Sequence, residues 1–103
     1  MLKLLKVSGK SLAPEYLEGD FVLIAKIPFL MRRLHTGDVV VFRHPLYGVL
    51  IKKVDSVSED RGEVLVTGTH TNSLDSRRFG AVRISSLLGK VIWHIRKTVQ
   101  HGS

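Results

Sequence analysis

Short runs of β-branched and aromatic residues, separated by glycine and proline, most strongly limit what this chain can fold into. The run Val39-Val40-Val41-Phe42 is typical, since it follows Gly37-Asp38 and is soon followed by Pro45. Residues of this kind favour strands, and glycine and proline favour the turns between them. The pattern predicts six strands: Leu2–Val7, Asp20–Ile27, Asp38–Arg43, Val49–Val57, Glu63–Thr67 and Gly89–Ile95.

Helix is scarce in the pattern. Only Pro14–Leu17 and Ile84–Leu88 are predicted to form short helical turns, and Ser58–Gly62 is predicted to be a polar hairpin turn. Many short strands joined by turns are typical of an all-β barrel or folded sheet. The 103 residues suffice for one domain of ordinary size. We therefore expect a mostly β, single-domain fold, either a coiled sheet or a barrel.

The chain is basic, with 16 Lys and Arg residues against 9 acidic residues and a formal net charge of +7. This balance favours an anionic partner such as nucleic acid, a membrane surface or an acidic peptide. The basic residues form no run, however, and only three adjacent pairs occur: Arg32-Arg33, Lys52-Lys53 and Arg77-Arg78. A basic surface without a dedicated partner is the simpler interpretation.

The apolar stretches are too short to cross a membrane. The longest, Phe21–Met31, is interrupted by Lys26 and Pro28, whereas a spanning helix needs about 20 apolar residues. We expect a soluble, cytoplasmic protein, with peripheral membrane contact left open. The absence of cysteine excludes disulfides, thiolate metal sites and a cysteine nucleophile.

Two residues have the chemistry of a nucleophile and a base. Ser11 follows a predicted strand on a turn between Gly9 and Pro14, where its hydroxyl can be exposed, although such serines more often cap turns. Lys52 shares one face of its predicted strand with Leu50, Val54 and Ser56. Burial of that face would disfavour the ammonium form of Lys52. Alternatively, its stem lies on apolar surface while the amine reaches water.

A third cluster of polar residues lies between Gly68 and Gly80. It contains Ser73, and it contains Asp75 and Arg77, which have opposite charges and can brace one another. Short polar side chains of this kind satisfy buried backbone groups and orient their neighbours. A solvated surface loop is the alternative interpretation of the same segment.

The order of these pieces resembles the signal peptidase I family of Ser/Lys proteases. The motifs that carry the resemblance extend from about Val7 to Val91. They are Gly9-Lys10-Ser11-Leu12-Ala13-Pro14, Gly19-Asp20, Gly37-Asp38-Val39-Val40-Val41-Phe42, Ile51-Lys52-Lys53-Val54, Asn72-Ser73-Leu74-Asp75-Ser76-Arg77-Arg78-Phe79-Gly80 and Gly89-Lys90-Val91.

The resemblance implies a role for each site residue. Ser11 corresponds to the nucleophile and Lys52 to the general base, while Ser73 corresponds to the serine that orients the lysine. Asp75 and Arg77 correspond to the brace of the family's Asp-Ser-Arg motif. Gly9 stands where the family has Ser or Gly, so the oxyanion hole would consist mainly of backbone N–H groups, including that of Ser11. The resemblance implies no cofactor and no metal.

It also implies a coiled β-sheet core, which we expect to occupy residues 1–97. The last residues, 98–103, are expected to form a frayed tail. The activity implied is removal of an N-terminal leader or propeptide from a precursor protein that binds as an extended strand. The family's membrane anchors and second domain have no counterpart in the sequence. In size and form the chain is therefore closest to the small soluble maturation proteases of nickel superoxide dismutase. It departs from the family at Leu12, where Met is usual, and at Thr69-His70.

Other functions stay open. Five histidines permit a Ser-His-Asp triad or a metal site at His44, His70 and His94, but none lies in a recognisable motif. A small basic β domain can also bind single-stranded nucleic acid, or bind peptides as a degenerate protease. The apolar segment Ile27–Leu34 is expected to cover the core, with contact to a lipid surface or a partner as the alternative.

Overall fold

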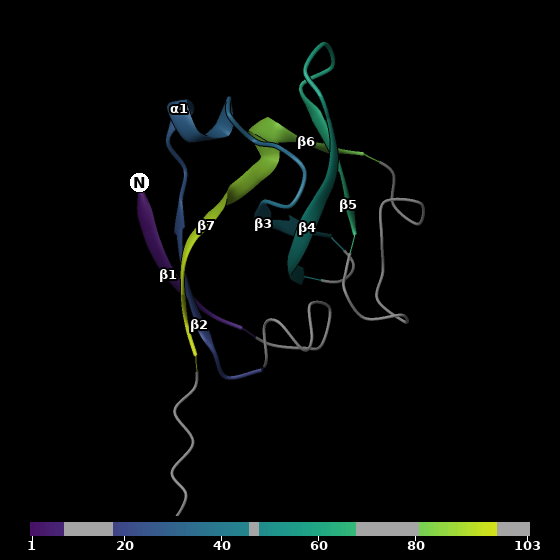
Figure 1. Ribbon diagram of the computed structural model, residues 1–103. Helices are drawn as coiled ribbons and strands as arrows, with labels where there is room; N and C mark the ends of the chain where they lie inside the picture. The colour runs from purple at the N-terminus through teal and green to yellow at the C-terminus, as the bar shows by residue number, and fades with distance from the viewer. Residues whose placement is uncertain (8–17, 46–47, 68–80, 97–103) are drawn as a thin grey trace, which may run out of the picture.

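The computed structural model describes residues 1–7, 18–45, 48–67 and 81–96. Its strands form one antiparallel sheet of seven in the order β1-β2-β7-β3-β4-β5-β6 (Figure 1). The strands are β1 (Leu2–Lys6), β2 (Phe21–Ala25), β3 (Val39–His44), β4 (Gly48–Ser58), β5 (Glu63–Thr67), β6 (Val82–Arg83) and β7 (Leu87–Ile95). The mostly β fold is therefore confirmed.

All six strands expected from the sequence are present, with shifts of one to two residues at most of their ends. The turn at Ile84–Leu88 is confirmed as the 3-10 helix η1 (Ile84–Ser86), and Pro14–Leu17 lies outside the described residues. Two elements were not expected, the two-residue strand β6 and the four-residue helix α1 (Pro28–Met31). Both are too short to leave a periodic pattern in the sequence.

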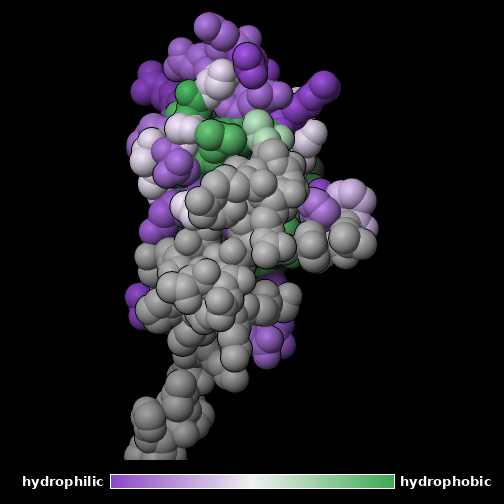
Figure 2. Space-filling view, turned by 90° about the vertical axis from the view of Figure 1, so that its right-hand side faces the viewer, coloured by the Kyte–Doolittle hydropathy of each residue, from purple (hydrophilic) through white to green (hydrophobic). Residues whose placement is uncertain are grey.

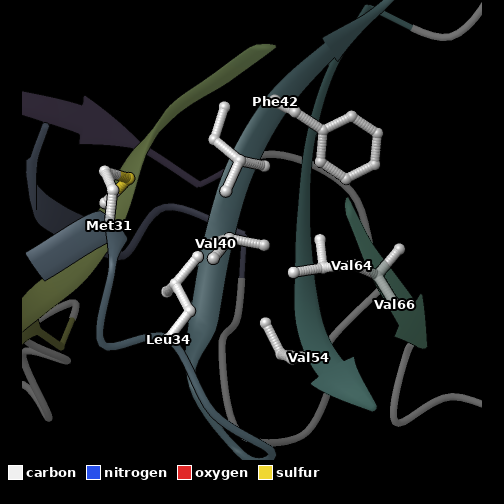
Figure 3. Close-up of a cluster of buried hydrophobic side chains, with 8 residues drawn as sticks. Met31, Leu34, Val40, Phe42, Val54, Val64 and Val66 are labelled. Carbon is white, nitrogen blue, oxygen red and sulfur yellow. The ribbon is translucent and has the colours of Figure 1, made fainter. Parts of the chain in front are cut away.

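The sheet coils so that its central strands are buried on both faces. Consecutive residues of β3, Val40, Val41 and Phe42, are all buried, although alternate residues of a strand point to opposite faces. Val40 and Phe42 belong to a first core cluster, shown in Figure 3, which comprises Met31, Leu34, Val40, Phe42, Val54, Val64, Val66 and Leu87. Val41 belongs to a second core cluster, which comprises Val7, Val22, Ile24, Val41 and Ile51.

The segment Ile27–Leu34 covers the core, as the sequence predicts. Met31 and Leu34 are buried in the first core cluster. Phe29 points outward and is 54% exposed, with the guanidinium carbon of Arg33 4.4 Å from the centre of its ring. Proline at the first position of α1 suits a short helix that starts directly after a strand.

The sequence predicts the wrong face of β4 for one side chain, that of Ser56. The sequence places Ser56 on the same face of β4 as Lys52, but the register with β5 shifts between Val54 and Ser56. Because the extra residue reverses the alternation, Val57 packs against the first core cluster and Ser56 turns to the other face. Leu50, Lys52 and Val54, which precede the bulge, keep the predicted alternation.

Candidate active site

Lys52 is the most deeply placed functional side chain in the described part of the molecule. It is 1% exposed, and it is the largest of the fully buried side chains among the described residues. Opposite it on β3 is Val40, which is also fully buried. Removal from water disfavours the ammonium form of any lysine and so favours an amine that can accept a proton. The buried alternative, as opposed to a stem with its amine in water, is therefore the observed one.

The apolar surroundings of Lys52 follow from strand register. Val54 of the same strand lies in the first core cluster, and Leu50 packs against that cluster. Lys53, the next residue, points to the other face, where its partners are Val39 on β3 and Thr67 on β5, and it is only half-buried. Two adjacent lysines thus differ sharply in burial because they face opposite sides of one strand.

The segment that carries Ser11 is anchored at both ends beside β4. The N–H of Val7 donates to the carbonyl of Asp20 at 2.7 Å, and the N–H of Gly19 donates to the carbonyl of Val7 at 2.9 Å. These two bonds bring together the points where the chain leaves the sheet and returns to it. Val7 also packs in the second core cluster with Ile51, the residue directly before Lys52.

The segment that carries Ser73 also starts beside Lys52. The last residue of β5, Thr67, pairs with Lys53. The chain returns to the sheet at β6, which pairs with the start of β5. The sheet therefore brings both ends of residues 8–17, and the first end of residues 68–80, to the level of Lys52 on β4.

Five of the predicted site residues belong to those two segments. Gly9, Ser11, Ser73, Asp75 and Arg77 lie outside the described residues, and their roles stay predictions. Lys52 is the predicted site residue that the structure describes. Among the described residues, no buried side-chain nitrogen or oxygen lacks a hydrogen-bond partner.

A buried pair of side chains, not predicted from the sequence, lies where the chain re-enters the sheet after residues 8–17. The Nε2 of His94 donates to Oδ2 of Asp20 at 2.7 Å, and Asp20 is 3% exposed. The pair joins the end of residues 8–17 to β7. From the sequence, Asp20 is expected at the start of a strand, and His94 is expected in a strand or, as the alternative, in a metal site. Because 74 positions separate them, no local motif reveals the pair.

The described residues contain no group of three His, Cys, Asp or Glu side chains placed to bind a metal ion, and His70 lies outside them. No helix among them has the length and apolar character needed to cross a bilayer.

The chain is similar in sequence to a known family and to a characterised bacterial protein. Residues 1–61 match the family described as "Signal peptidase, peptidase S26". The match includes the positions of Ser11 and Lys52 and ends before Ser73. The chain is 39% identical over 49 residues to signal peptidase I V of Bacillus subtilis, an alignment that covers 48% of this chain and 29% of that relative. No solved structure matches the chain significantly.

Proposed function

Because the chain belongs to the signal peptidase family, peptidase S26, we propose that it is a serine endopeptidase that removes a leader peptide or propeptide from a precursor protein. Ser11 is the nucleophile and Lys52 is the general base. The observation that carries the proposal is the burial of Lys52, at 1% exposure, beside the points where residues 8–17 leave and rejoin the sheet and where residues 68–80 leave it.

The first half of the reaction forms an acyl-enzyme. The neutral amine of Lys52 takes the hydroxyl proton of Ser11 as the serine oxygen attacks the carbonyl carbon of the scissile peptide bond. Backbone N–H groups at Gly9 and Ser11 stabilise the oxyanion that forms. The ammonium group of Lys52 then gives its proton to the leaving amine as the C–N bond breaks.

The second half restores the enzyme. Lys52, neutral again, takes a proton from a water molecule, whose oxygen attacks the ester carbon on Ser11. Collapse of the second tetrahedral intermediate breaks the ester bond, and the proton on Lys52 returns to the serine oxygen. A lysine can do this work only while its neutral form is populated, which is the chemical reason for its burial.

The remaining predicted residues support these two groups. In this proposal Ser73 orients the amine of Lys52 by a hydrogen bond, and Asp75 and Arg77 brace the segment that holds Ser73. The substrate binds as an extended strand along the sheet. The precursor that we favour is a nickel-type superoxide dismutase, because of the resemblance to its maturation proteases, and we place the reaction in the cytoplasm.

The test is cleavage of a peptide mixture and of a nickel superoxide dismutase precursor, with products identified by mass spectrometry. We expect the wild type to cut after small residues. Ser11→Ala and Lys52→Met should each lose at least about 10²–10⁴-fold in rate, the range that general base catalysis supplies. Met keeps the apolar stem of Lys52 in place but has no amine.

Lys53→Met is the matched control, because it removes the same group from the other face of the same strand. It should cut at close to the wild-type rate. Circular dichroism and urea unfolding establish that each variant is folded. Equal activity of wild type and Lys52→Met would refute the catalytic role of Lys52. A folded wild type that cuts none of these substrates would instead support a degenerate, peptide-binding protein.

A further inference from the structure

A cavity of about 710 Å³ opens beside the last residues of β4, beyond Lys52. It lies between helix α1, the turn that joins β4 to β5, and the β6–η1 connection. Its apolar wall is formed by Met31, Leu34, Val57 and Ile84. Figure 2 shows hydrophobic surface bordered by hydrophilic residues toward this end of the molecule. The volume is within the usual range for ligand sites.

Three arginines from three different elements line the cavity. Arg32 ends α1, Arg61 lies in the β4–β5 turn, and Arg83 lies in β6. None of the three guanidinium groups forms an ion pair or hydrogen bond with another described residue. Arg83 and Glu63 are direct partners in the β5–β6 register, yet no ion pair joins them.

Arginines that converge without partners on an apolar wall favour a ligand with both carboxylate and apolar groups. Glu59 and Glu63 also line the cavity. Their carboxylates repel a continuous polyanion such as a nucleic acid backbone, whereas a peptide can present separate acidic side chains to the arginines. The mixture of charges therefore points to a peptide.

The cavity shares a face of the sheet with Lys52. Val57 in the cavity wall and Val54 beside Lys52 both pack on the first core cluster. Val57 is five positions beyond Lys52 on β4, at most about 17 Å along the strand. The cavity is therefore near the proposed catalytic lysine but separate from it.

We propose that this cavity, defined by Arg32, Arg61, Arg83 and the apolar wall, is a second substrate-binding site that holds an acidic and apolar segment of the precursor. The inference rests on the proposed function for the identity of the peptide. The segment is distinct from the residues around the cleaved bond, and it binds with its carboxylates on the arginines and its apolar side chains on the wall.

The test measures binding separately from cleavage. The probe is a fluorescently labelled peptide in which Glu alternates with Leu and which has no cleavage site, and its matched control has Gln for Glu. Fluorescence anisotropy should show that the wild type binds the Glu peptide at least about tenfold more tightly than the Gln peptide, since hydrogen bonds to charged groups contribute at least about that factor.

Arg61→Gln and Arg83→Gln should each weaken binding of the Glu peptide about tenfold. Arg43→Gln is the matched control, because Arg43 is an exposed arginine of β3 outside the cavity, and it should bind as the wild type does. Arg83→Glu should instead prefer a peptide in which Lys alternates with Leu. Equal binding by wild type and Arg83→Gln would overturn the proposal, and so would tighter arginine-dependent binding of anionic vesicles or single-stranded DNA.

Cleavage then distinguishes this inference from the proposed function. With a cleavable peptide that carries the acidic segment, Arg83→Gln should raise KM about tenfold and leave kcat unchanged. With a short peptide that lacks the segment, Arg83→Gln and wild type should be equal. Cleavage without any effect of the arginines overturns the second site alone. Arginine-dependent binding by a wild type that never cleaves overturns the proposed function alone.

Discussion

Two turns of this molecule share the sequence Gly-Asp and a glycine with positive φ, but their aspartates have different partners. Gly19 and Gly37 have φ angles of 96° and 98°. Asp20 is buried and accepts a bond of 2.7 Å from His94 of β7. Asp38 lies in a more open turn, where Oδ2 accepts the N–H of His35 at 3.0 Å and is 3.5 Å from the Nζ of Lys90.

The difference shows what a local motif can and cannot determine. Glycine with positive φ, followed by a residue that enters a strand, sets the turn in both places. The tertiary structure then decides which groups surround the aspartate, whose side chain is 4% exposed at Asp20 and 11% exposed at Asp38. The first turn closes the base of the Ser11 segment, so its buried pair stabilises the region of the proposed nucleophile. The second turn leads into β3, which pairs with the strand of Lys52.

The largest expected effect is loss of the buried pair. Asp20→Ala should lower the free energy of unfolding by about 2–3 kcal/mol, because it removes a hydrogen bond to a buried carboxylate and leaves the imidazole of His94 without that partner. Asp38→Ala should cost only about 1 kcal/mol, since its partners are nearer to water. Urea unfolding of both variants measures the two values. Equal losses would show that burial does not distinguish the turns.

The distinction between local sequence and tertiary surroundings also explains which features the sequence predicted. The β-branched runs predicted the central strands, and alternation along Leu50, Lys52 and Val54 correctly placed Lys52 on an apolar face. Its burial was left open, because the core cluster on this face of β4 contains residues distant in sequence, Met31 and Val66 among them. The bulge beside Asp55 was not predicted, since nothing local in the run from Val49 to Val57 marks it, and so Ser56 was assigned to the wrong face.

Pairs of residues distant in sequence could not be predicted either, because they depend on how the strands pair. His94 is in a strand, as expected, but its contact with Asp20 depends on the register of β2 with β7. The cavity arginines likewise come from three elements, two of which, α1 and β6, were too short to predict. The family resemblance supplied the identities of Ser11, Ser73, Asp75 and Arg77, which strand patterns alone do not distinguish from turn residues.

A smaller effect is expected where the two turns are alike. Gly37→Ala should lower the free energy of unfolding by about 1–2 kcal/mol, the cost of a positive φ for an L-residue. A Cβ at this position would meet no atom within 4 Å, so the cost is conformational and not steric. Gly37→Asn should cost less, because Asn tolerates positive φ better. Thermal or urea unfolding that ranks Asn below Ala would contradict the conformational explanation.

The smallest effect should come from the histidine of the open turn. The Nδ1 of His35 donates to the carbonyl of Arg33 at 3.0 Å and lies 3.4 Å from Oδ2 of Asp38, and its side chain is 72% exposed. His35→Ala should therefore change the free energy of unfolding by less than about 0.5 kcal/mol, as is usual for exposed pairs. Asp38 keeps its bond from the backbone N–H of residue 35 and its contact with Lys90 in that variant.

His94→Ala, measured by the same urea unfolding, should cost several times more, because it removes the partner of a buried carboxylate. A loss at His35 as large as that at His94 would mean that the exposed contact stabilises its turn as strongly as the buried one, against the distinction drawn between the two turns.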